Sequence, residues 1–315
     1  MRAWQMTDVG RPLELREVPD PVAGAGEVII RLQASGLCHS DVGFVDGTLA
    51  PLLPFLPITL GHEIVGTIES LGSGVQGFAV GDRVGVPADI DTPGTASDGG
   101  FADLVAARSE LLVPIPDEVP FDQAATASCA GRTAYHALAS VGEVRPGMKV
   151  GIIGLGGLGA LGAQIGLALG ATVYAAEINE SLHDRFRALG LAGVSTDIRD
   201  FRDEQLDLIV DFAGFGTATT GAALEAVRNR GRVVVVGLAV ARGEIDINDL
   251  VLRSLELVGS QGGTKEDYVD ILELMRSGTV SSVIEHIGFE QIGDGIERLE
   301  RGGLVARLVV DLAER

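Results

Sequence analysis

The pattern of hydrophobic and polar positions divides the chain into two parts that predict different kinds of secondary structure. Up to about residue 115, short β-branched runs lie between glycine- and proline-rich turns, and the clearest are 28–32 and 64–68. Runs bounded in this way predict strands, so this part of the chain predicts a compact, irregular β domain. From Met148 onward, strand-like apolar runs alternate with helical patterns, which predicts βαβ units and a parallel sheet.

The same pattern places further elements along the chain. An alanine-rich run over 122–138 predicts a helix that is interrupted near Gly131. A capping-box-like sequence at Thr264 predicts a helix that runs to Ser277. The period of the apolar positions predicts strands over 150–153, 172–176, 208–212, 232–236, 255–258 and 304–312, and helices over 181–189 and 218–227.

A glycine-rich turn follows the first strand of the second part. It is a G-x-G-x-x-G pattern that includes Gly154, Gly156, Gly157, Leu158 and Gly159, and a helical run follows it. In this setting the first glycine permits a tight turn, the second lets a pyrophosphate approach the backbone, and the third allows close packing of helix on strand. Free N–H groups at the helix N-terminus complete a phosphate site. The turn therefore predicts dinucleotide binding; the alternative is a turn that serves packing alone.

The end of the next predicted strand carries an acid in the position that such a site uses. Glu177 would accept a hydrogen bond from the adenosine ribose and would repel a 2′-phosphate, which favours NAD over NADP. Arg185 and Arg187 lie close enough in sequence to serve a phosphate instead. NADP therefore stays the less favoured alternative.

Composition and charge exclude several classes of protein. The 315 residues carry 24 Lys and Arg against 44 Asp and Glu, a formal net charge of −20. Because the sequence has no basic stripe, we expect no nucleic-acid partner. The uncharged run over 150–176 is long enough to cross a bilayer, but its glycines fit a strand, a turn and a helix better, so we expect no membrane association. The first six residues show no apolar signal core, and we expect a cytoplasmic protein.

The only two cysteines are Cys38 and Cys129, which excludes a disulfide framework. Taken singly, each thiol is typical of a small buried residue, and His62 is typical of a surface position. Two thiolates and one imidazole nevertheless make a catalytic zinc set that leaves a fourth position open. The long separations between these residues exclude a zinc finger and fit a site assembled from distant parts of the chain.

The residues around these three positions make the chain resemble the zinc-dependent medium-chain alcohol dehydrogenases, nearly from end to end. The resemblance is carried by 36–41 (GLCHSD), 61–66 (GHEIVG), 81–84 (GDRV) and 129–135 (CAGRTAY). The two cysteines fall on the two cysteine-ligand positions of that family. The resemblance implies an α/β protein with a GroES-like irregular β domain, residues 1–130 and 264–315, and a Rossmann domain with a doubly wound parallel sheet, residues 131–263.

The resemblance also implies a role for each residue of the site. Cys38, His62 and Cys129 would hold one catalytic zinc ion, and Glu63 would lie beside it as an alternative ligand. Asp41 would fix the ring of His62, as metal-ligating histidines require. Further roles concern the alcohol and the cofactor: Ser40 would take the alcohol proton, Thr133 would border the nicotinamide, and His39 and Arg307 would contact the pyrophosphate. The alternatives are a surface charge for Arg307 and a space-filling loop residue for His39.

The chain departs from the family's pattern in three places. Residues 86–100 contain no cysteine and form a short segment, which implies that the lobe with a structural zinc is absent. The position of the family's relay histidine is Gly43. The alcohol proton would then leave from Ser40 and the cofactor ribose to water or another base. Residues 85–88 lack the aromatic that often narrows the substrate pocket, which implies a roomier apolar pocket.

The resulting hypothesis is an NAD-linked, zinc-dependent oxidoreductase whose substrate is a small molecule, an alcohol that it interconverts with an aldehyde or ketone. One alternative is a zinc-independent quinone or enoyl reductase of the same superfamily, although its members lack the ligand pattern. The other is a non-enzymatic nucleotide-binding protein that kept the fold. Because relatives are dimers or tetramers, we expect a homodimer or homotetramer, with the predicted strand 255–258 as a candidate contact.

Overall fold

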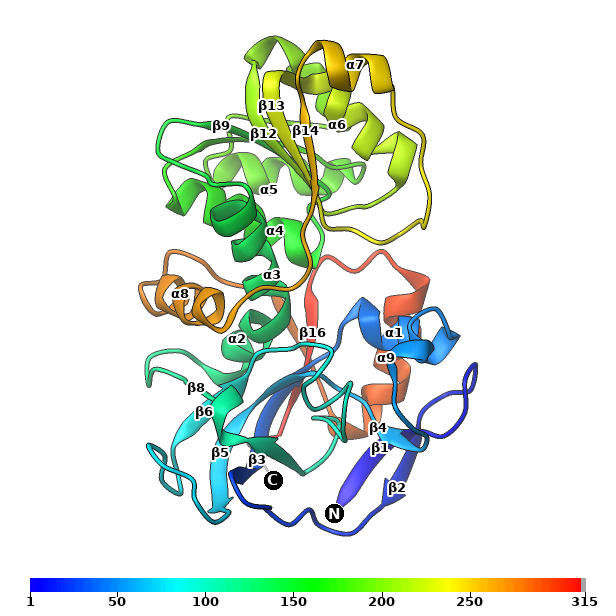
Figure 1. The fold of residues 1–315 in the computed structure, drawn as a ribbon, viewed down its shortest axis with the longest axis vertical. Coiled ribbons are helices and arrows are strands. Elements are labelled where there is room, and N and C mark those ends of the chain that lie inside the picture. Colours follow the sequence, from blue (N-terminus) through cyan, green and yellow to red (C-terminus); the bar gives the residue numbers. More distant parts are fainter. Residues whose placement is uncertain (313–315) are drawn as a thin grey trace. The chain divides into compact units, whose positions relative to one another are not determined.

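The computed structural model describes residues 1–312, and the chain divides into two compact units. The first unit comprises Met1–Cys129, Thr264–Arg276 and the chain from Ser281 onward. The second comprises Ala130–Gly263 and Ser277–Val280. Figure 1 follows the chain through both units in sequence colours. Among the described residues, no helix is both long and apolar enough to cross a membrane.

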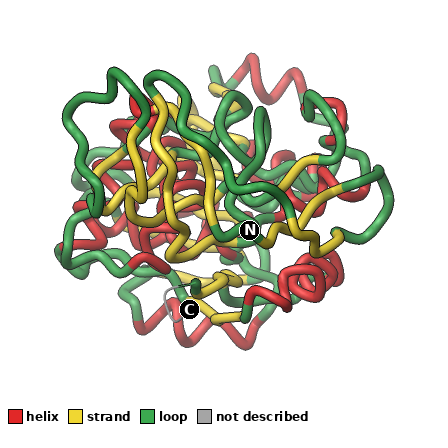
Figure 2. Tube along the Cα trace, turned by 90° about the horizontal axis from the view of Figure 1, so that it is seen from below, coloured by secondary structure: helices red, strands yellow, loops and turns green. Residues whose placement is uncertain are grey.

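The first unit is built around a seven-stranded, mostly antiparallel sheet. Its central strands are β3 (Glu27–Gly36) and β5 (Glu63–Leu71), which pair with each other, and β16 (Arg307–Asp311) lies on the other side of β3. The remaining strands of the sheet are β6 (Arg83–Val86), β7 (Leu104–Arg108), β8 (Val113–Pro114) and β15 (Ile284–Ile287). A small sheet in the order β2-β1-β4 joins β1 (Arg2–Met6), β2 (Glu14–Glu17) and β4 (Ile58–Thr59). In Figure 2, which colours the elements by type, the N-terminus lies among strands and loops.

The core of this unit lies between the sheet and the helices that cover it. Val28, Ile30, Ile64 and Ile68 are buried at alternating positions of β3 and β5. The β-branched runs that predicted these strands therefore supply side chains to a single apolar cluster. The covering helices include α1 (His39–Asp46), α2 (Phe121–Thr126), α8 (Lys265–Arg276) and α9 (Ile292–Arg301).

The second unit contains a six-stranded parallel sheet in the order β11-β10-β9-β12-β13-β14. This is the Rossmann strand order, in which the direction of winding reverses between the first and the fourth strand. The reversal lies between β9 (Lys149–Ile153) and β12 (Leu206–Asp211), at the end where the glycine-rich turn begins. The other strands are β10 (Thr172–Ala176), β11 (Gly193–Ser195), β13 (Val227–Val235) and β14 (Glu256–Gly259). In Figure 1, α4 (Gly157–Ala168), α5 (His183–Ala188), α6 (Thr220–Ala226) and α7 (Ile247–Leu252) lie around this sheet.

The predicted fold class, a GroES-like β unit plus a Rossmann unit, is confirmed, but some predicted elements differ. The predicted interruption near Gly131 is wrong, because the chain stays helical there. It continues from α2 through a π-helical turn (Ala127–Gly131), α3 (Arg132–Tyr135) and a second π-helical turn (His136–Val141). β13 begins at Val227 rather than at residue 232, because pairing with β12 extends it through polar residues that carry no strand pattern.

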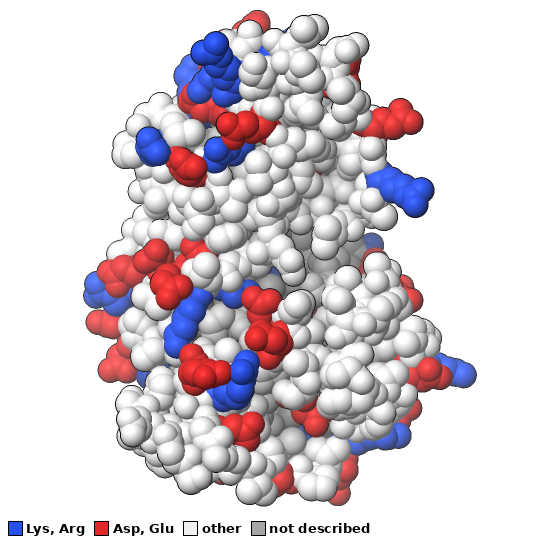
Figure 3. Space-filling model, viewed as in Figure 1, with Lys and Arg blue, Asp and Glu red and all other residues white. Residues whose placement is uncertain are grey.

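Charged side chains are interspersed on the surface. On the face that Figure 3 shows, Lys and Arg lie among Asp and Glu. A typical pair joins Arg298 and Glu285 at 2.8 Å, with both side chains partly exposed. Exposed pairs of this kind contribute only about 0–1 kcal/mol each. Burial of the two apolar cores, rather than surface ion pairing, therefore holds the fold.

Candidate functional site

The structure brings the four predicted ligand residues together within the first unit. Cys38 is the N-cap of α1, His62 precedes β5, Glu63 begins β5, and Cys129 lies in the first π-helical turn. The ligand atoms of these four side chains all lie within 4.8 Å of one another. The register of the sheet explains part of this, because Gly36 at the end of β3 pairs with Glu63 at the start of β5.

The chemistry of this cluster fits a zinc ion. Two sulfurs, an imidazole and a carboxylate are the donors that zinc prefers, and the residues other than Cys129 are buried. A hydrogen bond from Cys129, helped by His62, holds the pKa of the Cys38 thiol well below its ordinary value despite burial. The same hydrogen bond, together with burial, holds the pKa of Cys129 well above its ordinary value. The environment thus favours a thiolate at Cys38, which is the form that binds metal.

Asp41 on α1 orients two of the ligands. Its carboxylate is fully buried, and Oδ2 accepts a hydrogen bond from the backbone N–H of Cys38 at 2.9 Å. Its Oδ1 lies 3.2 Å from Nδ1 of His62. Burial opposes a charge on His62, but the Asp41 carboxylate outweighs it and holds the pKa of His62 well above its ordinary value. Because Nδ1 faces Asp41, Nε2 is the ring nitrogen left for a metal.

Glu63 and Arg307 form a buried ion pair beside the cluster. Oε1 of Glu63 accepts a hydrogen bond from Nη2 of Arg307, and the two side chains are 0% and 6% exposed. Oε2 of Glu63 is buried and has no hydrogen-bond partner among the described residues. A Cβ at Gly36 would overlap this oxygen, so the close approach requires a glycine. Burial raises the pKa of Glu63 to about 7, although Arg307 opposes the shift.

This ion pair was missed in the sequence analysis, and it excludes the surface-charge alternative for Arg307. The available signal was an arginine directly before three apolar residues, Leu308 to Val310, in β16. An arginine that is buried in a strand needs an acidic partner, because charged side chains are almost never fully buried unless they are paired. Its partner was not predictable, because Glu63 is far away in the sequence.

The residues next to Cys38 differ in exposure. Ser40 is partly buried, and its Oγ lies 3.8 Å from Sγ of Cys38. His39 is exposed. Gly43 is buried, and a Cβ there would lie 3.0 Å from the Leu49 side chain. The space around position 43 is therefore filled by leucine rather than by a polar relay group.

The glycine-rich turn lies at the reversal point of the parallel sheet. Gly154 has a φ of +82°, and a Cβ at Gly159 would overlap the carbonyl oxygen of Gly154, so both positions require glycine. A Cβ at Gly156 would meet no atom within 4 Å, so this backbone faces open space. Helix α4 begins at Gly157, followed by Leu158, and its N–H groups face the turn. Ligands of open α/β sheets bind at this place, and helix N-termini bind phosphates.

Glu177 lies directly after β10 and is anchored to this turn. Its Oε2 accepts a hydrogen bond from the N–H of Leu155 at 2.7 Å, and its Oε1 accepts one from Asn179 at 2.8 Å. Nε2 of the buried His183 lies 2.7 Å from the backbone oxygen of Glu177. The contact of His183 with Glu177 was not predicted from the sequence. The only signal was the position of His183 at the start of a short helix.

The two arginines considered as phosphate ligands differ in their surroundings. Arg187 donates to Asp184 at 2.9 Å and to the backbone oxygen of Val194 at 3.0 Å. Arg185 is exposed and lies over the ring of its neighbour Phe186. Arg187 is thus engaged within its own unit, whereas Arg185 faces solvent.

Asp211 is a second buried carboxylate that the sequence analysis missed. It ends β12 and is fully buried. It accepts hydrogen bonds from the backbone N–H groups of Ala213 and Gly214 and from the hydroxyls of Thr219 and Thr220. These bonds shape the loop beside the glycine-rich turn. The sequence signal was an aspartate that ends an apolar run and is followed by glycines and threonines.

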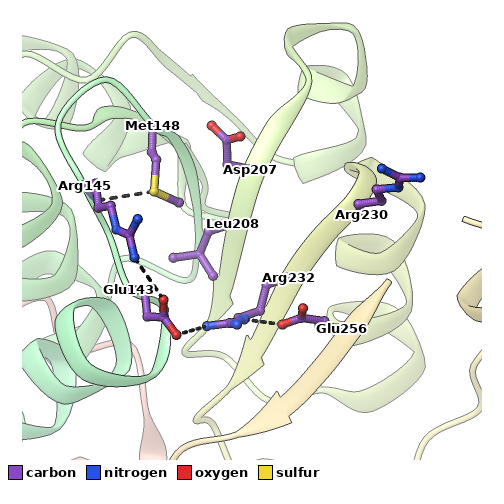
Figure 4. Close-up of a pocket in the computed structure, with 9 residues that line it drawn as sticks. Glu143, Arg145, Met148, Asp207, Leu208, Arg230, Arg232 and Glu256 are labelled. Atoms are coloured by element: carbon purple, nitrogen blue, oxygen red, sulfur yellow. Dashed lines mark hydrogen bonds and ion pairs between the residues drawn. The ribbon is translucent and has the colours of Figure 1, made fainter. Parts of the chain in front are cut away.

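Figure 4 shows a hollow near the amino ends of the strands of the parallel sheet, whereas the glycine-rich turn lies at their carboxyl ends. Four of the six charged residues that line it pair with one another. Arg232 contacts Glu256 at 2.6 Å and Glu143 at 3.5 Å, and Arg145 contacts Glu143 at 3.4 Å.

Thr133 lies in the second unit, on α3, and is buried. It follows Cys129 by four residues along the same helical run.

Known protein families match residues in both units of the chain. The alcohol dehydrogenase GroES-like domain family matches residues 24–117, and the zinc-binding dehydrogenase family matches residues 157–277. An alcohol dehydrogenase of Geobacillus stearothermophilus is 33% identical over 339 residues, which cover 98% of this chain and 99% of that protein.

Two solved structures are similar over almost the whole chain. A crystal structure of an NAD-dependent alcohol dehydrogenase has a TM-score of 0.90 at 27% identity and covers 99% of this chain and 100% of its own. The structure of acetophenone reductase from Geotrichum candidum in complex with NAD has a TM-score of 0.88 at 30% identity. The match covers 99% of this chain and 97% of that chain. Since the likeness extends from end to end in both sequence and structure, the chain belongs to the zinc-type medium-chain alcohol dehydrogenase family.

Proposed function

We propose that this protein catalyses the reversible, NAD-linked oxidation of an alcohol to an aldehyde or ketone, with one zinc ion held by Cys38, His62 and Cys129. The observation that carries the proposal is the buried cluster of two thiols, an imidazole and a carboxylate. When bound, the zinc ion supplies Lewis acidity that lowers the pKa of an alcohol, and NAD supplies the hydride acceptor. Relatives named as alcohol dehydrogenases support this activity.

The chain's own residues orient the ligands and move the proton. Asp41 holds the ring of His62 and the backbone of Cys38, so that their ligand atoms keep one arrangement. Ser40, whose hydroxyl lies beside Cys38, takes the proton of the alcohol and gives up its own hydroxyl proton in the same step. Because Gly43 offers no relay side chain, the proton would then leave from Ser40 and the cofactor ribose to water or to another base. Glu63 keeps one carboxylate oxygen without a hydrogen-bond partner among the described residues, and in this proposal it acts as an alternative ligand.

The glycine-rich turn and its neighbours bind the dinucleotide in this proposal. The turn and the N-terminus of α4 hold the pyrophosphate, which His39 and Arg307 also contact, and Thr133 borders the nicotinamide. Glu177 selects NAD, since its carboxylate is held at the end of β10. The engagement of Arg187 with Val194 and Asp184 supports NAD over NADP.

Replacing Glu177 with glutamine is expected to shift cofactor preference toward NADP. The amide keeps an oxygen for the N–H of Leu155 but loses the charge that repels a 2′-phosphate. A hydrogen bond to a charged group is worth about 1.5–3 kcal/mol, so the ratio of kcat/KM for NAD to that for NADP should fall about 10- to 100-fold. Steady-state kinetics with both cofactors measures this ratio. Glu180→Gln, at an exposed nearby position, is the control and should leave it unchanged; an unchanged ratio in Glu177→Gln would remove Glu177 from cofactor selection.

Two features of the first unit bear on substrate and metal content. Val86 ends β6, and Pro87 and Ala88 follow it, where relatives often carry an aromatic, so we propose a pocket that accepts bulkier alcohols. Residues 86–100 offer no thiol, so we propose a single zinc ion per chain and no structural zinc.

The function is tested by assaying alcohols and carbonyl compounds of graded size with NAD and NADP, with and without a chelator. The proposal predicts NAD-linked turnover that the chelator abolishes and added zinc restores. Chelator-resistant reduction of quinones or enoyl compounds would instead identify the zinc-independent reductase. Absence of turnover on the whole panel would favour a non-enzymatic nucleotide-binding protein.

We also propose that the protein is a homodimer or homotetramer that pairs through β14. This strand is the edge of the parallel sheet, and its residues Leu257 and Val258 are each 37% exposed. Exposed apolar edge strands tend to pair with another chain unless they are protected. Leu257→Lys is therefore expected to halve the mass measured by gel filtration with light scattering. A wild-type mass equal to one chain would contradict the proposal.

A further inference from the structure

Residues 88–101 connect the two segments of the first unit that carry His62 and Cys129. At one end, the N–H of Ala88 donates to the backbone oxygen of Ser128, the residue before Cys129, at 3.1 Å. At the other end, the N–H groups of Gly99, Gly100 and Phe101 donate to the backbone oxygens of Thr59, Gly61 and Leu60 at 2.9, 2.6 and 3.0 Å. These acceptors directly precede His62. One short segment thus bonds to the backbone on both sides of the metal cluster.

The same segment also packs directly against the backbone of His62. Gly94 has a φ of +92°, and a Cβ there would lie 2.6 Å from the oxygen of Gly61 and 2.7 Å from Cα of His62. A Cβ at Gly99 would lie 2.5 Å from the same oxygen of Gly61. The atoms in the way belong to the backbone, which cannot rotate aside as a side chain can. Any side chain at Gly94 must therefore displace the chain that carries the histidine ligand.

The segment has a defined shape of its own. The hydroxyl of the buried Thr92 accepts from the N–H of Asp89 at 2.8 Å and donates to its backbone oxygen at 2.9 Å. The N–H of Gly94 donates to the backbone oxygen of Ser97 at 2.8 Å. Oδ1 of Asp98 accepts from the N–H of Thr59 at 2.7 Å. These bonds make the segment a rigid spacer rather than a free loop.

We propose that residues 88–101 are a positioning segment that sets the distance between His62 and Cys129, and that Gly94 and Gly99 are its positioning residues. The proposal rests on the zinc site proposed above. The segment does not touch the reacting groups in this account; it acts through the two ligands. Its glycines are required because the backbone of the ligand segment lies where a side chain would be. Variants of these glycines should therefore change metal binding itself.

The test compares Gly94→Ala with Gly81→Ala in the full chain. The two glycines have φ values of +92° and +93°, so alanine strains the backbone equally at both. Only at Gly94 does the added Cβ meet other atoms, because Gly81 has nothing within 4 Å. The probe is Co²⁺ added to metal-stripped protein, with affinity and visible absorption spectrum measured well below the unfolding temperature. Loss of a group that positions a metal ligand typically weakens metal binding about 10- to 100-fold. We expect a loss of this size in Co²⁺ affinity, together with an altered absorption spectrum, for Gly94→Ala but not for Gly81→Ala.

Asp98→Ala is a milder second variant, since Asp98 is exposed and its loss only frees the N–H of Thr59. We expect it to fold and to weaken Co²⁺ binding severalfold, so the proposal stays testable even if Gly94→Ala does not fold. Unchanged affinity and spectrum in the folded variants would overturn the proposal, as would an equal loss in Gly81→Ala. If the wild-type protein itself binds no Co²⁺, the proposed zinc site fails, which is a different result.

Discussion

Cys38→Ala is expected to abolish NAD-linked alcohol oxidation while NAD binding survives. The thiolate of Cys38 is the ligand that the cluster favours most strongly, since hydrogen bonds from Cys129 and His62 stabilise it. Lewis-acid polarisation is worth several kcal/mol of transition-state stabilisation. The loss in kcat/KM should therefore be about 1,000-fold or more. Zinc content by mass spectrometry should fall with activity, and calorimetry should show NAD affinity within about 2-fold of the wild type, because the glycine-rich turn is untouched.

The chain offers a matched control for the histidine ligand. His62→Ala should behave as Cys38→Ala does, whereas His286→Ala should retain zinc and activity. His286 is also paired with an aspartate, Asp122 at 2.9 Å, but its side chain is 52% exposed. Full turnover in a Cys38→Ala protein that contains no zinc would contradict the proposed mechanism.

Arg307→Met is expected to cause the largest loss of stability. Glu63 is fully buried and Arg307 is its only ion-pair partner among the described residues. Removing one partner of a buried pair leaves an uncompensated charge and typically costs about 3–5 kcal/mol of unfolding free energy. Urea unfolding of metal-stripped protein measures this loss. The control is Arg298→Met, whose exposed pair with Glu285 should contribute about 0–1 kcal/mol.

The loss in Arg307→Met should depend on pH with a definite sign. In the wild type, burial raises the pKa of Glu63 to about 7 from an ordinary 4.5, so its contribution to stability falls as pH rises between these values. Without Arg307, which lowers this pKa, the folded variant holds its proton to higher pH. The stability deficit should therefore be smaller at pH 5, where Glu63 is protonated in both proteins, and should widen above pH 7. If the stability deficit of Arg307→Met shrinks above pH 7, the charge of Arg307 does not lower the pKa of Glu63.

Much of the fold could be predicted because local pattern and tertiary structure agree. β9 and β10 are apolar runs next to glycine-rich turns, and β10 matches its predicted bounds. The polar start of β13 and the π-helical turn around Cys129 were not predictable in this way. Both depend on pairing and packing with segments far away in the sequence, and no local pattern records such contacts.

The same distinction, between local sequence pattern and contacts with distant segments, applies to the candidate site. Residues that carry chemistry of a distinctive type, such as Cys38 and His62, could be identified from sequence. One supporting contact, that of Asp41 with His62, was also predicted. Most of the others could not be predicted, because they are made between backbone atoms or between side chains that are distant in the sequence. The Glu63–Arg307 pair, the bond from His183 to Glu177 and the packing of Gly94 on His62 became visible only in three dimensions.

The central claim is that two sulfurs and one ring nitrogen of this chain hold a catalytic zinc ion. X-ray absorption at the zinc edge of the purified protein tests it most directly, because sulfur and nitrogen ligands are distinguished by their distances, about 2.3 Å and about 2.0 Å. The account predicts about one zinc ion per chain, with two sulfur and two nitrogen or oxygen ligands. A first shell without sulfur, or one with four sulfurs, would contradict it.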